Sequence, residues 1–69
     1  MRISARNSFP GTITEISRGP VSTEVTIKIA PKIEIVSVIT TNSAKRLKLT
    51  IGTKAYAIVK SDNVIVGTD

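Results

Sequence analysis

The chain has 69 residues, and its composition limits the ways in which so small a domain could be stabilised. A chain of this length buries little apolar surface, so such domains commonly add disulfides, a metal or a partner subunit. Cysteine and histidine are both absent, which excludes disulfides and thiolate or imidazole metal ligands. We therefore expect a single domain over residues 1–69 that associates with further copies of itself.

The charge balance favours an anionic partner. Ten Lys and Arg residues against five Asp and Glu residues give a formal net charge of +5. Nucleic acid is disfavoured, because the only aromatic residues are Phe9 and Tyr56, whereas single-strand binders stack bases on several rings. An enzyme is disfavoured too, since histidine and cysteine are missing and the acidic residues show no paired spacing.

The sequence shows no membrane segment. No apolar run reaches the length of a spanning helix, and Met1–Ser4 leads into patterned sequence without an apolar signal segment. We therefore expect a cytoplasmic protein without a membrane partner.

The first half of the chain predicts two strands. After Phe9, which we expect in the core, Thr12–Ile16 is rich in β-formers, and the spacing of its isoleucines predicts a bulge or a bend. Ser17–Pro20 is a turn. Val21–Ile29 then alternates strictly, as in a strand with one face in the core. Its apolar face comprises Val21, Thr23, Val25, Ile27 and Ile29.

A hairpin at Ala30–Lys32 leads into a strand that is apolar on both faces. In Ile33–Thr40, Val36 and Val38 lie on the face opposite the isoleucines. In so short a chain, a strand of this kind is expected to cover an interface between subunits.

The remaining elements complete an all-β map. A short helix follows Thr40, the chain turns at Gly52, Ala55–Lys60 is a fourth strand, and Val64–Val66 is a fifth. Short strands joined by small turns predict an antiparallel β-barrel that is closed or nearly closed, with one short helix.

The junction between the third strand and the helix is a candidate anion site. Hydroxyl and amide side chains gather there in Thr40–Ser43, where the first N–H groups of the helix are unpaired. A purely structural alternative is a helix N-cap, in which Thr41 or Asn42 accepts a hydrogen bond from an amide two or three residues further on.

Four pieces of the chain carry a family resemblance. They are Ser4–Asn7, Ile39–Thr40 followed by Ser43–Ala44, Leu49 with Gly52, and Ile58–Ser61. In this order and spacing they resemble the molbindin or Mop domain family of small molybdate-binding proteins, over nearly the whole chain. One departure is Val38, where the family often has alanine.

The resemblance implies a fold, an assembly and a function. The family fold is an OB-like five-stranded antiparallel β-barrel. Free-standing members form hexamers, described as trimers of dimers, that bind molybdate or tungstate between subunits. The implied role is intracellular molybdenum storage or homeostasis, with no catalytic step, no organic cofactor and no free metal cation.

The resemblance also implies the residues of the oxyanion site. By position, the family's binding residues fall on Ser4, Arg6, Thr40, Ser43, Lys60 and Ser61. A tetrahedral dianion presents only acceptors, so Arg6 and Lys60 would supply charge and the four hydroxyls would supply directed hydrogen bonds. Sulfate would be rejected by size, whereas tungstate and molybdate would be poorly distinguished.

Two alternatives to oxyanion binding remain open. An OB-type module that binds single-stranded nucleic acid would show strongly salt-dependent binding of oligonucleotides. A purely structural oligomerisation module would assemble equally well without any anion.

Overall fold

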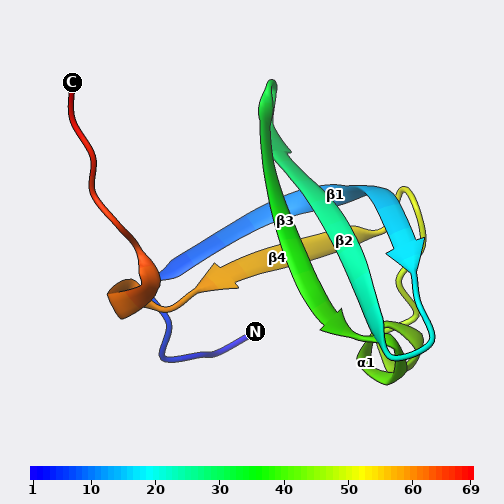
Figure 1. The fold of residues 1–69 in the computed structure, drawn as a ribbon. Helices are drawn as coiled ribbons and strands as arrows, with labels where there is room; N and C mark the ends of the chain where they lie inside the picture. Colours follow the sequence, from blue (N-terminus) through cyan, green and yellow to red (C-terminus); the bar gives the residue numbers. More distant parts are fainter.

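One antiparallel sheet accounts for most of the protein. In the computed structural model, which describes residues 1–69, its strands lie in the order β3-β2-β1-β4 and curl around a small core (Figure 1). The elements are β1 (Asn7–Arg18), β2 (Ser22–Ala30), β3 (Ile33–Thr40), α1 (Thr41–Arg46), β4 (Lys54–Val59) and the 3₁₀ turn η1 (Ser61–Asn63). The expected all-β fold with one short helix is confirmed.

The long strand β1 pairs with two different neighbours. Its first half runs antiparallel to β4 and its second half runs antiparallel to β2, so that Thr12 lies opposite both Lys28 and Lys54. The predicted bulge is confirmed by a register shift between Ile13 and Glu15. A bulge increases the local twist of a strand, and the sheet therefore coils at the point where β1 changes partner.

Gly11 allows the backbones to approach closely beside this bulge. A Cβ atom at this position would lie 2.6 Å from the carbonyl oxygen of Lys28 and 2.8 Å from the Cγ2 atom of Ile27. Any larger residue would push β1 away from β2 at the centre of the sheet.

The core is small. Its buried cluster consists of Ile13, Val25, Ile27 and Ala57, with half-buried aliphatic residues packed around them. The alternation predicted for β2 is confirmed for Thr23, Val25 and Ile27, which are buried. Val21 was expected on the same face, but it precedes the strand and is 76% exposed. Phe9 was expected in the core, but 40% of its surface is exposed, since it lies where the sheet has no second layer over it.

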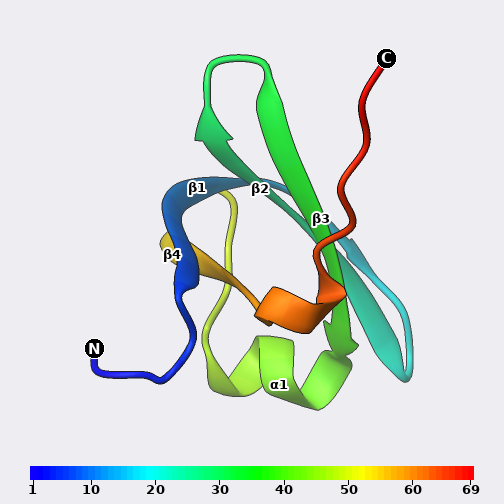
Figure 2. The same ribbon diagram turned by 90° about the vertical axis from the view of Figure 1, so that its left-hand side faces the viewer.

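The predicted fifth strand is not formed within the single chain. Residues Val64–Val66 follow η1 as an extended segment that leads away from the sheet (Figures 1 and 2). Ile65 is 93% exposed and Val66 is 86% exposed. The sheet therefore has four strands, and β3 and β4 are its two unpaired edges.

The helices are short. The single α-helix has six residues, and no helix in the structure has the length and hydropathy that crossing a bilayer would require.

The close approach at Gly11 gives the first prediction. Gly11→Ala should lower the free energy of unfolding by about 1–3 kcal/mol, because the added methyl group meets backbone that cannot move without disturbing the sheet. Chemical denaturation at a fixed protein concentration measures this change. Gly67→Ala is the matched control, because a Cβ there meets nothing within 4 Å, and equal stability of the two variants would contradict the prediction.

Candidate functional site

The first cluster of candidate site residues lies at the start of α1. Thr40, with φ −67° and ψ 146°, is the N-cap, and its Oγ1 accepts a hydrogen bond from the Ser43 amide at 3.0 Å. The sequence suggested Thr41 or Asn42 as the cap. Thr40 takes this role because β3 extends through it and only the next residue turns into the helix.

The hydrogen bonds of this cluster leave one hydroxyl proton free. Thr40 Oγ1 donates to Ser43 Oγ at 2.8 Å, so the Ser43 proton remains available to a ligand. The amides of Thr41 and Ser43 are already bonded to Val21 O and Thr40 Oγ1. The side-chain donor that this cluster offers is therefore the Ser43 hydroxyl, polarised by the hydroxyl of Thr40.

A buried network fixes this cluster in place. Thr41 Oγ1 donates to Gly19 O at 2.7 Å, and it lies 2.8 Å from Thr23 Oγ1. Because Thr41 has only one hydroxyl proton, Thr23 must be the donor in the second bond. Together with the Thr41 amide bond to Val21 O, these contacts anchor the first residue of α1 to the turn between β1 and β2.

The second cluster surrounds a shallow hollow of about 350 Å³. The hollow is lined by Ser4, Ala5, Arg6, Lys60, Ser61 and Asp62. Pairing of Asn7 with Val59 brings the N-terminal arm beside the end of β4, so residues far apart in sequence meet there. Four of the six predicted site residues therefore lie together.

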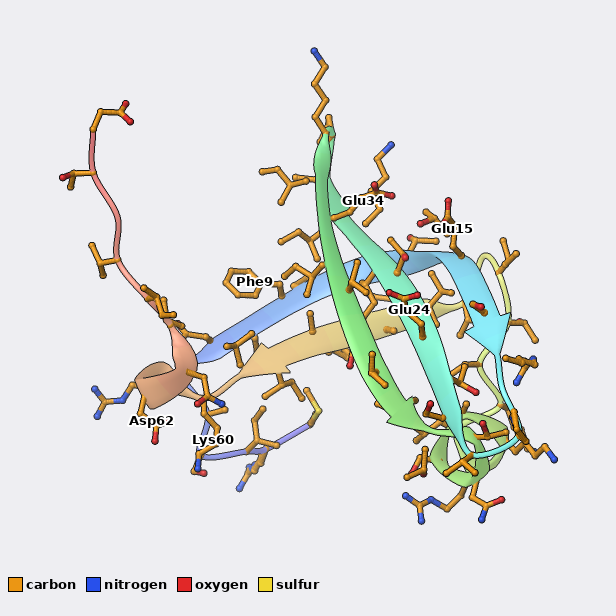
Figure 3. The ribbon with its side chains drawn as sticks, viewed as in Figure 1. Phe9, Glu15, Glu24, Glu34, Lys60 and Asp62 are labelled. Atoms are coloured by element: carbon orange, nitrogen blue, oxygen red, sulfur yellow. The ribbon has the colours of Figure 1, made fainter.

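The two clusters lie at opposite ends of the molecule. Lys60 follows the residue that pairs with Asn7 at one end of β1, whereas Thr41 contacts Gly19 beyond the other end. Lys60 and Asp62 accordingly lie far from α1 in the view of Figures 1 and 3. A strand of 12 residues spans roughly 36 Å at about 3.3 Å per residue before curvature. One chain therefore does not bring the six residues into a single site.

Cations lie at both ends of the molecule. Lys45 and Arg46 lie in the last turn of α1, near the first cluster. Arg6 and Lys60 line the second hollow, where Asp62 is the one acid. Glu15, Glu24 and Glu34 lie on β1, β2 and β3 (Figure 3), and Lys28 lies opposite Glu34 in the sheet.

Sequence reasoning missed two residues at these clusters, and it gave Thr41 a different role. Thr23 and Thr41 position the helix start, and Asp62 lines the hollow. Thr23 carried a usable signal, because it is the one polar residue among apolar ones on the inward face of β2 and a buried hydroxyl needs a partner. Asp62 gave no such signal, since an Asp-Asn pair is also typical of a turn.

Comparison with known proteins gives a consistent result. A family model described as the TOBE domain matches residues 3–66. Over 69 residues, the chain is 52% identical to the molybdenum transport protein ModE of Herbaspirillum seropedicae, of which it spans only 26%. It is also 38% identical to a probable molybdenum-pterin-binding protein of Haemophilus influenzae, and this match covers all of both chains.

A solved structure shares the fold. The cytoplasmic molybdate-binding protein ModG, with molybdate bound, matches with a TM-score of 0.94 and 39% sequence identity. The match covers 100% of this chain and 49% of that one. This likeness confirms the OB-like fold that the sequence resemblance implied.

The buried threonine network gives the second prediction. Thr41→Val should lower the free energy of unfolding by about 1–3 kcal/mol, because Thr23 and Gly19 O each lose a buried partner. Thr41→Ser keeps the hydroxyl and should retain most of the stability. Denaturant titration compares the two variants with Thr12→Val, an exposed control on β1, and a Thr41→Ser variant as unstable as Thr41→Val would refute the role of the hydroxyl.

Proposed function

Since the chain belongs to the TOBE domain family, and within it to the molbindin or Mop group, we propose that it binds molybdate. The proposal is supported above all by two complementary donor clusters in a chain that matches, over all of its own residues, 49% of a protein with molybdate bound. Tungstate, which has the same charge and nearly the same size, is the expected second ligand.

The site is formed between copies of the chain. The cluster of Thr40 and Ser43 supplies hydroxyls, whereas the other cluster supplies Arg6 and Lys60 with two further hydroxyls. Placing the cluster of Thr40 and Ser43 in one copy against the hollow of Arg6 and Lys60 in another copy puts both sets of donors around one anion. Each cluster is then half of a site, which accounts for its being open to solvent in the single chain.

The chemistry of the combined donors suits a tetrahedral dianion. Arg6 offers a planar fork of N–H groups and Lys60 a compact ammonium, and these neutralise the two negative charges. Ser4, Ser43 and Ser61 donate hydroxyl protons in directions that a smaller sulfate ion could not satisfy together. Asp62 lowers the local positive charge, so directed hydrogen bonds matter more here than charge alone.

Exposed apolar surface supports a homo-oligomer. Only five apolar residues are buried, whereas Val36 and Val38 on β3 are 56% and 68% exposed. Apolar residues on the outer face of an edge strand are typical of a subunit interface. We propose a hexamer built as a trimer of dimers, which acts in the cytoplasm in molybdenum storage or homeostasis and carries out no catalytic step.

Binding of single-stranded nucleic acid is not favoured by the structure. Phe9 lies opposite Ala57 and Tyr56 lies opposite Pro10 in the ladder between β1 and β4. Because neighbouring positions in a ladder face opposite sides of a sheet, the two aromatic rings do not form one stacking platform.

Calorimetric titration of the protein with molybdate, beside sulfate at equal ionic strength, tests the proposed ligand. Arg6→Ala and Lys60→Ala should each weaken molybdate binding about tenfold or more, because each removes a charge-assisted hydrogen bond. Lys32→Ala, in the hairpin between β2 and β3, is the charge-matched control and should bind normally. Folded, anion-free protein that gives no heat with molybdate would rule the function out.

Mixing two defective variants tests whether the site lies between copies. Arg6→Ala damages one half-site and Ser43→Ala damages the other, so each variant alone should bind poorly. Unfolding and refolding the two together should restore a fraction of intact sites, since some interfaces then join two unaltered halves. Molybdate titration of the mixture measures this recovery, and a mixture no better than its components would place the whole site within one chain.

A further inference from the structure

Asp62 is the one acidic side chain of the second cluster. The hollow of about 350 Å³ is lined there by Arg6 and Lys60, by Ser4 and Ser61, and by Asp62. No acidic residue occurs in residues 1–14 or 35–61, so neither the N-terminal arm nor β4 carries a second carboxylate. Asp62 therefore brings a negative charge to a place where every other polar side chain can donate a hydrogen bond.

The path of the backbone holds Asp62 at this place. Lys60 continues the extended conformation of β4, with φ −65° and ψ 139°, and the 3₁₀ turn η1 follows at once. The amide of Asn63 donates to Lys60 O at 3.0 Å, which closes the turn around Asp62. Across the hollow, pairing of Asn7 with Val59 holds the N-terminal arm. Asp62 accordingly lines the hollow, and Figure 3 shows it next to Lys60.

A structural role in the turn does not require the charge of Asp62. Asp is favourable in the first turn of a helix and is common in turns, but Asn forms turns equally well and has nearly the same shape. None of the side-chain hydrogen bonds of the structure involves Asp62, so its carboxylate does not hold a neighbouring group in place. What the charge can change is the ligand that the hollow receives.

A carboxylate in an oxyanion hollow distinguishes ligands by their protons. An ionised carboxylate can only accept hydrogen bonds. Molybdate and sulfate carry no proton at neutral pH, so their oxygen atoms would face those of Asp62 as acceptor against acceptor, with like charges. Phosphate keeps a proton and can donate it to the carboxylate in a charge-assisted hydrogen bond.

We propose that Asp62 determines which oxyanions this hollow binds. It weakens the binding of oxyanions without a proton, molybdate included, and it accepts a hydrogen bond from an oxyanion that carries one. The inference rests on the oxyanion site of the proposed function, and it adds a group in that site that acts against the ligand. Asp62 thereby raises the molybdate concentration at which the site fills.

The charge of the ligand determines the size of the effect. A dianion interacts twice as strongly with a unit charge as a monoanion does at the same distance. Between neighbouring groups in a hollow that is open to water, this repulsion corresponds to roughly tenfold in affinity. A second copy that covered the hollow would exclude water and increase the effect.

Calorimetric titration of Asp62→Asn tests the proposal. Molybdate should bind about tenfold more tightly to this variant than to the native protein at equal ionic strength. Sulfate and phosphate are compared through their competition with molybdate, at a mildly alkaline pH at which both are dianions and only phosphate holds a proton. The affinity for sulfate should rise as that for molybdate does. The affinity for phosphate should rise much less or fall, because the variant loses the charged acceptor.

Two further variants serve as controls. Glu15→Gln removes the same charge from an exposed position on β1 outside the hollow, and it should leave all three affinities within about twofold. Asp62→Ser also removes the charge and keeps a residue that favours turns, and it should strengthen molybdate binding as Asp62→Asn does. A folding defect of one substitution therefore does not decide the result.

Two results would overturn the proposal. One is molybdate binding by Asp62→Asn and Asp62→Ser that is no tighter than that of Glu15→Gln. The other is an equal gain for sulfate and phosphate, because the proton of the ligand would then make no difference.

This inference and the proposed function fail separately. Molybdate binding that Asp62→Asn leaves unchanged would keep the function and remove the role of Asp62. Native protein might instead give no heat with molybdate while direct titration shows tighter binding of phosphate than of sulfate. Loss of that preference in Asp62→Asn would then keep the role of Asp62 and remove the function.

Discussion

The structure depends on the way in which β1 is shared between β4 and β2. Because the bulge after Ile13 and the close approach at Gly11 let one strand change partner, four strands curl around a core without a second sheet. Because β1 is long, the groups that lie beside its two ends are far apart. The N-terminal arm and Lys60 meet at one end, and the turn that holds Thr41 lies at the other. The separation of the two donor clusters is thus a consequence of how the sheet is built.

The small core follows from the same arrangement. A four-stranded curl leaves two edges, and the side chains beneath the gap are covered by nothing in the chain itself. Large hydrophobic residues remain exposed on β3, on β4 and in the segment after η1, more than an isolated 69-residue domain would be expected to tolerate. In the proposed oligomer, association would complete both the core and the binding site.

Local patterns in the sequence predicted most of the fold. The alternation of Val21–Ile29 predicted β2, and the irregular spacing of Ile13 and Ile16 predicted the bulge. Local pattern could not predict which strand pairs with which. Val64–Val66 has the composition of a strand, but composition does not say whether an edge within the same chain is within reach. The six predicted site residues came from the family resemblance, whereas the network of Thr23 and Thr41 required the three-dimensional contacts.

An anion held between copies would stabilise the assembly as well as being its bound ligand. A ligand that binds only the assembled state stabilises that state by about 2.7 kcal/mol at 100 times its dissociation constant. Until the anion binds, the cations of Arg6 and Lys60 have only the carboxylate of Asp62 beside them in their hollow. If that hollow met a second copy without an anion, the cations would lose their hydration, and too few negative charges would be present to compensate for the cost in free energy. The dianion removes this penalty, so occupancy and assembly are expected to rise together with molybdate concentration.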